Sequence, residues 1–124
     1  MPEIQVIFPA ADPSSTQVTV AQVLAPTVVA RERERITWLF YNCDPRIQFA
    51  EVEFANRSHK FFLAGGTQES HKFKKGIAGN GDIYGEVPDL SANRPVSAKY
   101  TVRGWGSSQN KCSEVDPEIL VNEP

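Results

Sequence analysis

Two cysteines and two histidines are the residues of this 124-residue chain with the most direct chemistry. Cys43 and Cys112 each follow a segment that carries Trp or Tyr, and His59 and His71 lie between them. Thiolates and imidazoles together can bind zinc or copper, and two thiols can form a redox pair. Closely paired cysteine spacings are absent, however, so two small packed thiols are the simpler interpretation.

A basic strip is the second candidate feature. The tripeptide His59-Lys60-Phe61 recurs as His71-Lys72-Phe73, and Gly65-Gly66 between them could close a hairpin. The strip would suit an acidic partner or a phosphate, whereas its simpler interpretation is a solvated edge strand that lysines protect from edge-to-edge pairing. The basic residues of the strip are Lys60, Lys72, Lys74 and Lys75.

Trp105 stands between Gly104 and Gly106 at the end of an expected strand. It is a candidate aromatic platform for a partner or a ligand, and packing into the core or under a lid is the alternative. We expect Trp105 and the four lysines of the basic strip to form a partner-contact surface.

Recognisable catalytic motifs are absent from the sequence. It contains neither the nucleophile elbow G-x-S-x-G nor the zinc motif H-E-x-x-H. The glycine-rich stretch from Gly76 to Gly81 has no strand-loop-helix context that would make it a phosphate cradle. We therefore expect a protein that is not an enzyme and that carries no cofactor and no metal.

The composition limits the class of protein further. Lys plus Arg number 13 against 15 Asp plus Glu, for a formal charge of -2, and 40% of the residues are hydrophobic. This balance argues against disorder and against nucleic-acid binding. No stretch is long and apolar enough for a membrane span, and no signal peptide is visible. We expect a cytoplasmic protein without membrane contact, with an exported mature form left open.

Period-two alternation of apolar and polar residues recurs along the chain and predicts half-buried β-strands. The strongest strand covers 36–41, a bulge or two strand pieces are expected within 47–54, and 71–75 is expected at an edge. We predict a single antiparallel Greek-key β-sandwich over residues 1–124, with about seven to nine short strands. The residues expected in the core are Ile36, Trp38, Phe40, Val52, Phe54, Tyr100, Val102, Ile119 and Val121.

Three segments resemble the cupredoxin-like family of β-sandwiches. Residues 34–42 (ERITWLFYN) are similar to the family strand V-x-W-x-N, and 99–102 (KYTV) to the strand before the family's metal loop. The closing segment 116–121 (DPEILV) is similar to the final I-x-V strand. The resemblance implies a cupredoxin-like sandwich.

The ligands of a copper-binding member are missing from the expected loop. Such a member has a Cys with a His and usually a Met in the loop before the last strand, but no His and no Met follow Cys112 here. We therefore expect a member without copper ligands, whose function is to bind another protein or to assemble with itself. The alternatives are a metal-binding or redox protein, and a small-ligand or carbohydrate-binding module.

Overall fold

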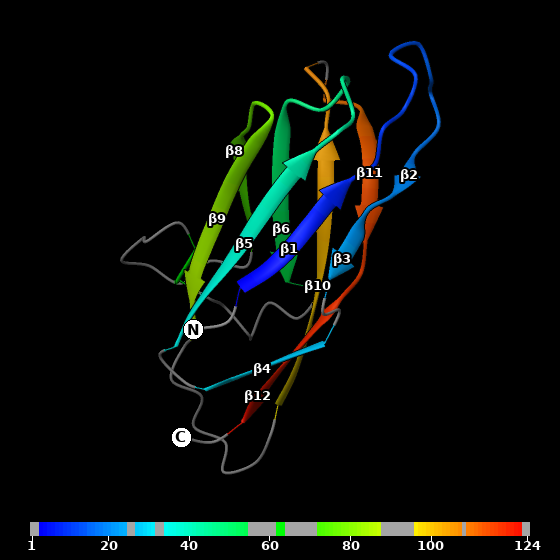
Figure 1. Ribbon diagram of the computed structural model, residues 1–124. Coiled ribbons are helices and arrows are strands. Elements are labelled where there is room, and N and C mark those ends of the chain that lie inside the picture. The colour runs from blue at the N-terminus through cyan, green and yellow to red at the C-terminus, as the bar shows by residue number, and fades with distance from the viewer. Residues whose placement is uncertain are drawn as a thin grey trace.

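The computed structural model describes residues 3–24, 27–31, 34–54, 62–63, 72–87, 96–107 and 109–122. This part of the chain holds twelve β-strands and no helix (Figure 1), so the predicted all-β class is confirmed. Nine of these strands have five residues or more. Their bounds are β1 (Glu3–Phe8), β2 (Thr19–Val20), β3 (Gln22–Leu24), β4 (Thr27–Arg31), β5 (Arg35–Asn42), β6 (Phe49–Phe54), β7 (Phe62–Leu63), β8 (Lys72–Gly76), β9 (Asn80–Glu86), β10 (Val96–Trp105), β11 (Lys111–Val115) and β12 (Glu118–Asn122).

The strands form two sheets that face each other as a sandwich. The first sheet has the order β3-β1-β5-β9-β7 and lies in front in Figure 1. In the second sheet, β10 pairs with β6 on one side and with β11 and β12 on the other, while β8, β2 and β4 extend it outwards. Three pairings are parallel (β1 with β5, β2 with β11, β4 with β12), so the sandwich is mixed and not purely antiparallel.

A long hairpin organises the second sheet. The register of β10 with β11 places Val102 opposite Val115, and the register with β12 places Lys99 opposite Glu118. The two pairings are continuous across Asp116-Pro117, where the backbone N–H of Tyr100 donates to the Pro117 carbonyl at 3.1 Å. Pro117 has no backbone N–H that could donate a hydrogen bond back to β10, which accounts for the interruption between β11 and β12.

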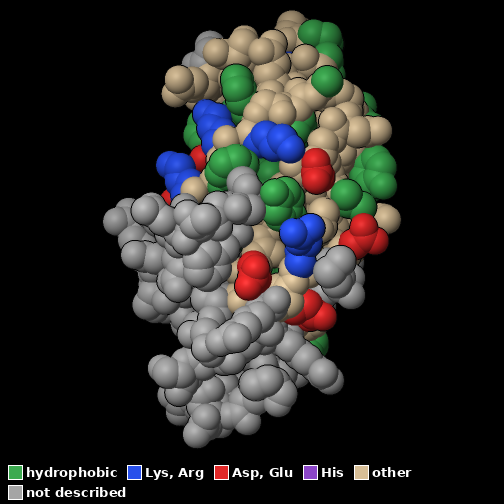
Figure 2. Space-filling view, turned by 90° about the vertical axis from the view of Figure 1, so that its left-hand side faces the viewer, with side chains coloured by type: hydrophobic (Ala, Val, Ile, Leu, Met, Phe, Trp, Pro, Cys, Tyr) green, Lys and Arg blue, Asp and Glu red, His purple; other side chains and the backbone are tan. Residues whose placement is uncertain are grey.

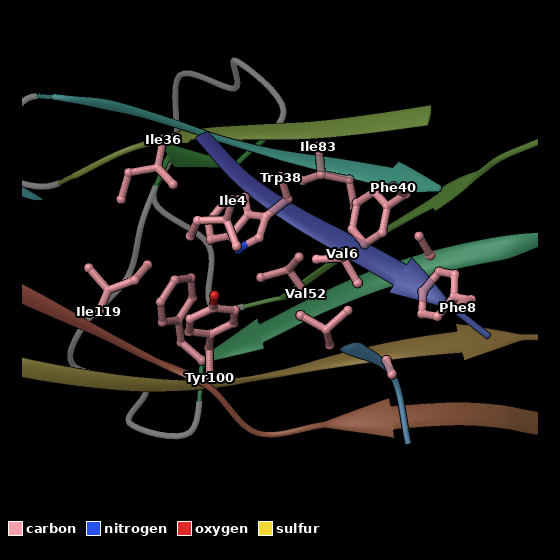
Figure 3. Packing of buried hydrophobic residues seen from close by; sticks show 14 of the residues in the cluster. Ile4, Val6, Phe8, Ile36, Trp38, Phe40, Val52, Ile83, Tyr100 and Ile119 are labelled. Atoms are coloured by element: carbon pink, nitrogen blue, oxygen red, sulfur yellow. The ribbon is translucent and has the colours of Figure 1, made fainter. Parts of the chain in front are cut away.

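The core lies between the sheets and follows the expected alternation (Figure 3). Eight of the nine predicted core residues are buried, and the side chain of Val121 lies outside the described part. Phe8 stacks on Phe40 at 5.7 Å between ring centroids, and Trp38 meets Tyr100 edge-on at 5.6 Å. Aromatic pairs in this geometry stabilise beyond the area they bury.

Two polar atoms are carried into this core. The indole nitrogen of Trp38 and the hydroxyl of Tyr100 are both buried without a hydrogen-bond partner, and Figure 3 shows both inside the sandwich. Burial raises the pKa of Tyr100 to about 12, against a smaller opposing effect of the Trp38 indole. Tyr100 therefore stays protonated at neutral pH and acts as a core residue.

One sequence-based expectation is wrong and another falls partly outside the described residues. The turn of the hairpin that Gly65-Gly66 could close is not described; of the segments on either side, β7 pairs with β9 in the first sheet and β8 pairs with β6 in the second. The bulge expected within 47–54 is absent: β6 pairs with β10 in unbroken register from Phe49 to Phe54, and the irregularity lies instead between Gly104 and Trp105 against β11.

Truncation of the central strand tests this core. We expect Trp38→Ala or Phe40→Ala to lower the free energy of unfolding by about 3–5 kcal/mol, because each removes a large, fully buried side chain. Thr37→Ala on the opposite face of β5 is the matched control and should change it by less than about 1 kcal/mol. Urea denaturation measures all three. Equal losses for Trp38→Ala and Thr37→Ala would show that the strand faces are assigned wrongly.

Candidate functional site

The outer side of the second sheet carries a set of charged and aromatic side chains, which we call the charged face. It is formed by the residues of β8, β6, β10 and β11 that alternate with core residues. One row of it runs across the strands in register: Lys74 is opposite Glu51, Glu51 opposite Arg103, and Arg103 opposite Glu114. Val20 of β2 ends the row next to Glu114 and is 73% exposed.

Arg103 is the centre of the charged face. Its Nη1 donates to Glu51 Oε1 at 2.9 Å and to Glu53 Oε1 at 2.6 Å, and its Nε donates to Glu114 Oε2 at 2.7 Å. One guanidinium thus bonds three carboxylates from the two strands that flank β10. Since Glu51 is buried, its charge depends on these partners.

The ionisation of the cluster follows from these bonds. Burial acts to lower the pKa of Arg103, but the hydrogen bonds to Glu53, Glu114 and Glu51 outweigh it and raise that pKa. The hydrogen bond from Arg103 lowers the pKa of Glu114, with a further contribution from Lys111, whose Nζ lies 3.3 Å from Glu114 Oε1. Arg103 and Glu114 are therefore both charged at neutral pH.

An aromatic pair lies at one end of the charged face. Phe49 and Trp105 are opposite each other in register, and the Lys74 ammonium lies 5.3 Å and 4.7 Å from their ring centroids. The Trp105 indole nitrogen donates to Glu51 Oε1 at 3.2 Å, which fixes the orientation of the ring. The rings and Lys74 thus form one contact unit, stabilised by cation–π attraction.

The structure brings together some of the residues predicted for the partner surface. Lys72 and Lys74 share the charged face with Trp105. Lys75 points to the other side of β8, where its Nζ lies 3.0 Å from the Asp82 carbonyl oxygen and 3.4 Å from the Asp82 carboxylate. Lys60 lies outside the described residues. Figure 2 looks onto the side where β8 and β9 lie, and there basic, acidic and hydrophobic side chains are interspersed.

Sequence reasoning missed the carboxylates and the arginine of the charged face. Glu51 and Glu53 alternate with core residues of β6, and Arg103 directly follows Val102, a core residue of β10. Their alternation could have assigned them to the outer face. Nothing in the sequence showed that β6 and β10 are neighbours.

A second buried charge lies outside the charged face. Arg46 Nη2 donates to Asp44 Oδ2 at 2.7 Å and to the Cys112 carbonyl at 3.2 Å, and its Nη1 donates to the carbonyl oxygens of Ser15 and Gln17, both at 2.9 Å. Burial acts to raise the pKa of Asp44, but the hydrogen bonds and charge of Arg46 outweigh it and lower that pKa. Arg46 joins the β5–β6 connection to β11 and to the chain before β2, which is a structural role.

The two cysteines are placed differently from each other. Cys112 lies within β11 and is buried, not in a loop as expected, and burial raises the pKa of its thiol. Cys43 is exposed after β5 and lines an open hollow of about 370 Å³, together with Asp44, Gln48 and Ile77. Both cysteines are free thiols.

No metal-binding group is found within the described residues. In the ranges given above, no three His, Cys, Asp or Glu side chains gather as a metal site, while His59 and His71 lie outside those ranges. Among the described residues there is also no helix long and apolar enough to cross a membrane.

No protein-family model and no curated protein matches this chain. Three solved structures are similar in fold. They are a multicopper oxidase (7% identity, TM-score 0.48, 98% of this chain and 43% of that chain), McoA multicopper oxidase from Aquifex aeolicus (7%, 0.47, 98% and 29%), and Lac15 from a marine microbial metagenome (15%, 0.44, 99% and 32%). The chain spans less than half the length of each. These identities and TM-scores are too low to assign a site, a metal or an activity to this chain.

Removing the central guanidinium tests the charge cluster. We expect Arg103→Met to lower the free energy of unfolding by about 3 kcal/mol at neutral pH, because it leaves buried Glu51 without its main partner. Lys99→Met, an exposed change on the same strand, is the control. Chemical denaturation measures both.

The same pair of variants gives a pH dependence. A carboxyl whose pKa is lowered by folding stabilises the fold at pH values above its pKa in the unfolded chain, which is 4.5 for Glu114. That contribution is lost as the pH falls through the lower pKa of the folded state. The difference in free energy of unfolding between wild type and Arg103→Met should therefore be largest at neutral pH and should shrink below pH 4.5. A difference that does not change with pH would contradict the cluster's ionisation.

Proposed function

We propose that this chain is a non-catalytic, cupredoxin-like sandwich that binds an acidic segment of another protein at the β8 end of its charged face. The observation that carries the proposal is the separation of charges on that face. Arg103 is bonded to three glutamates, whereas at the β8 end Lys72 is 52% exposed and Lys74 lies over an aromatic pair. A partner's carboxylates would meet these two lysines.

The geometry of the ion pairs supports this separation. Lys72 Nζ lies 3.9 Å from Glu51 and its side chain is 52% exposed, whereas the side chain of Arg103 is 21% exposed and its ion-pair contacts are 2.6 to 2.9 Å. Exposed ion pairs of this kind contribute little to stability and exchange readily with an incoming carboxylate.

The spacing of the lysines on the charged face suits an extended acidic segment. Lys72 and Lys74 are two residues apart on one strand, which places their backbones about 7 Å apart. Side chains two residues apart in an extended chain have the same spacing, so alternate carboxylates of such a segment match both lysines.

The aromatic pair supports a protein contact as well. Phe49 and Trp105 offer apolar area next to the cations, and aromatic residues are enriched in the centres of protein interfaces. A carboxylate that reaches Lys74 would therefore pack its chain against both rings. A carbohydrate platform is less favoured, since the Lys74 ammonium already covers the Trp105 ring.

Charge reversal on β8 tests the proposal. We expect the variant Lys72→Glu/Lys74→Glu to bind a ten-residue glutamate peptide at least about tenfold more weakly than wild type at low salt, with the difference fading as salt screens it. Lys99→Glu, an exposed lysine on the part of β10 paired with β12, is the matched control and should bind like wild type. Titration calorimetry measures the affinities. Equal binding by all three proteins would place the contact elsewhere.

The proposal requires a function without a bound metal, and a metal titration tests this requirement. We expect no intense blue band when Cu(II) is added to the reduced protein, because Cys112 is buried in a strand with its carbonyl bound to Arg46. Type 1 copper needs a thiolate and two imidazoles at one point. A blue band, or about one zinc per chain surviving dialysis, would favour the metal-binding alternative.

A further inference from the structure

β8 lies at the margin of the second sheet, beyond β6. Among the strands that the structure describes it pairs with β6 alone, so its other backbone edge has no strand partner in that part of the chain. Gly76 at the end of β8 is exposed, and because glycine has no side chain, this exposure belongs to the backbone. We call this side of β8 the open edge.

The hydrogen-bond pattern shows which backbone groups the open edge carries. The Ile77 N–H donates to the Gln48 carbonyl at 2.9 Å, one pair beyond the end of the β6–β8 ladder. Opposite residues of an antiparallel pair alternate between exchanging hydrogen bonds and pointing their N–H and C=O groups away from each other. Every second residue from Ile77 back along β8 therefore bonds to β6, while Lys74 and Gly76 present their groups to the open edge.

The cations of the charged face lie along the same strand. The Lys74 ammonium is 4.7 Å from the Trp105 ring centroid, and Lys72, two residues earlier, has a side chain that is 52% exposed. Residues of a strand added at the open edge would have their Cβ atoms about 4.5–5.5 Å from those of the β8 residues opposite them, on the same side of the sheet. A carboxylate at every second position of that strand would therefore form cross-strand ion pairs with both lysines.

The inner side of β8 defines the positions between those carboxylates. Phe73 is opposite the buried Val52 and packs against the core, yet it stays partly exposed. A residue of an added strand opposite Phe73 would lie beside this ring at the margin of the core, which favours an apolar side chain. The open edge thus favours a segment in which acidic and apolar residues alternate.

We propose that the acidic partner segment binds as an added β-strand on the open edge, with its carboxylates on the charged face and its apolar residues beside Phe73. The proposal rests on the proposed function and names the form of its ligand, an extended segment of alternating acidic and apolar residues. Main-chain hydrogen bonds to Lys74 and Gly76 supply affinity, and the lysines of β8 supply specificity, as is general for peptides bound by strand addition.

A second copy of this chain does not suit the open edge. A twofold pairing of two β8 strands would bring their lysines together on one side of the extended sheet, and like charges in cross-strand positions are destabilising. Lysines on an edge strand oppose pairing between copies for this reason. An acidic strand reverses the sign of the interaction, so the same side chains that exclude a copy favour the partner.

Seven-residue peptides of alternating glutamate and valine test the proposal on the whole chain. N-methylation removes a backbone N–H and leaves the charge unchanged. The glutamates opposite the lysines exchange hydrogen bonds with β8 if the added strand is antiparallel, and the valines do so if it is parallel. We expect methylation of two glutamates or of two valines to weaken binding by at least about tenfold for one set and by less than about twofold for the other. NMR titration of the labelled protein at low salt gives the dissociation constants.

A pair of variants tests the same contact from the side of the protein. Gly76→Pro removes an N–H of the open edge and no hydrogen bond to β6, a placement that edge strands tolerate. Gly76→Ala keeps the N–H, and its Cβ would meet no atom closer than 3.8 Å. We expect Gly76→Pro to weaken binding of the unmethylated peptide by about three- to tenfold, as for one lost hydrogen bond, and Gly76→Ala to bind like wild type. Circular dichroism of both variants shows whether they keep the wild-type fold, and the methylated peptides test the wild-type protein if Gly76→Pro does not.

The outcomes separate this proposal from the proposed function. Equal binding of the two methylated peptides, or equal binding by folded Gly76→Pro and Gly76→Ala, would overturn strand addition. If Lys72→Glu/Lys74→Glu still weakened binding in that case, the acidic partner site would stand without it. No binding of the unmethylated peptide to wild type would overturn both.

Discussion

The guanidinium of Arg103 is the interaction on which the surface of this sandwich depends. It bonds Glu51, Glu53 and Glu114 from both neighbours of β10, and so it permits three carboxylates on one sheet face. Without it, Glu51, which also accepts the hydrogen bond of the Trp105 indole, would be a buried anion that has lost its nearest cation. The same face continues to β8, where Lys72 is 52% exposed.

The core was predictable because alternation identifies which side of a strand is buried. Ile36, Trp38 and Phe40 alternate with polar or half-exposed neighbours, and the structure buries all three. Strand partners were not predictable, because pairing depends on contacts between distant segments. The bulge was misassigned for a related reason: Phe49 is out of phase with Val52 because it belongs to the outer face, next to Trp105.

The candidate site was predictable in its residue types and only partly in its members. The lysines of β8 and Trp105 stand out by composition and position in the sequence. Their arrangement depends on β6, which lies between β8 and β10 and supplies Phe49 and Glu51. Cys112 shows the limit of reasoning from a family loop, since here that position is a buried residue of β11. Alternation could not have shown this, because Cys112 and Ser113 are both buried where the register of β10 with β11 shifts.

The central claim is that the charged face, and not the core or another surface, is the contact site for an acidic partner. Two-dimensional NMR of ¹⁵N-labelled protein during titration with a glutamate-rich peptide tests it directly, because the two indole N–H groups report on different places. Trp105 donates to Glu51 on the charged face, and Trp38 is buried in the core. The account predicts a progressive shift of the Trp105 indole signal and of the β8 amides, with the Trp38 indole unchanged. Shifts confined to residues around the Cys43 hollow or on the outer side of the first sheet, with Trp105 unmoved, would contradict it.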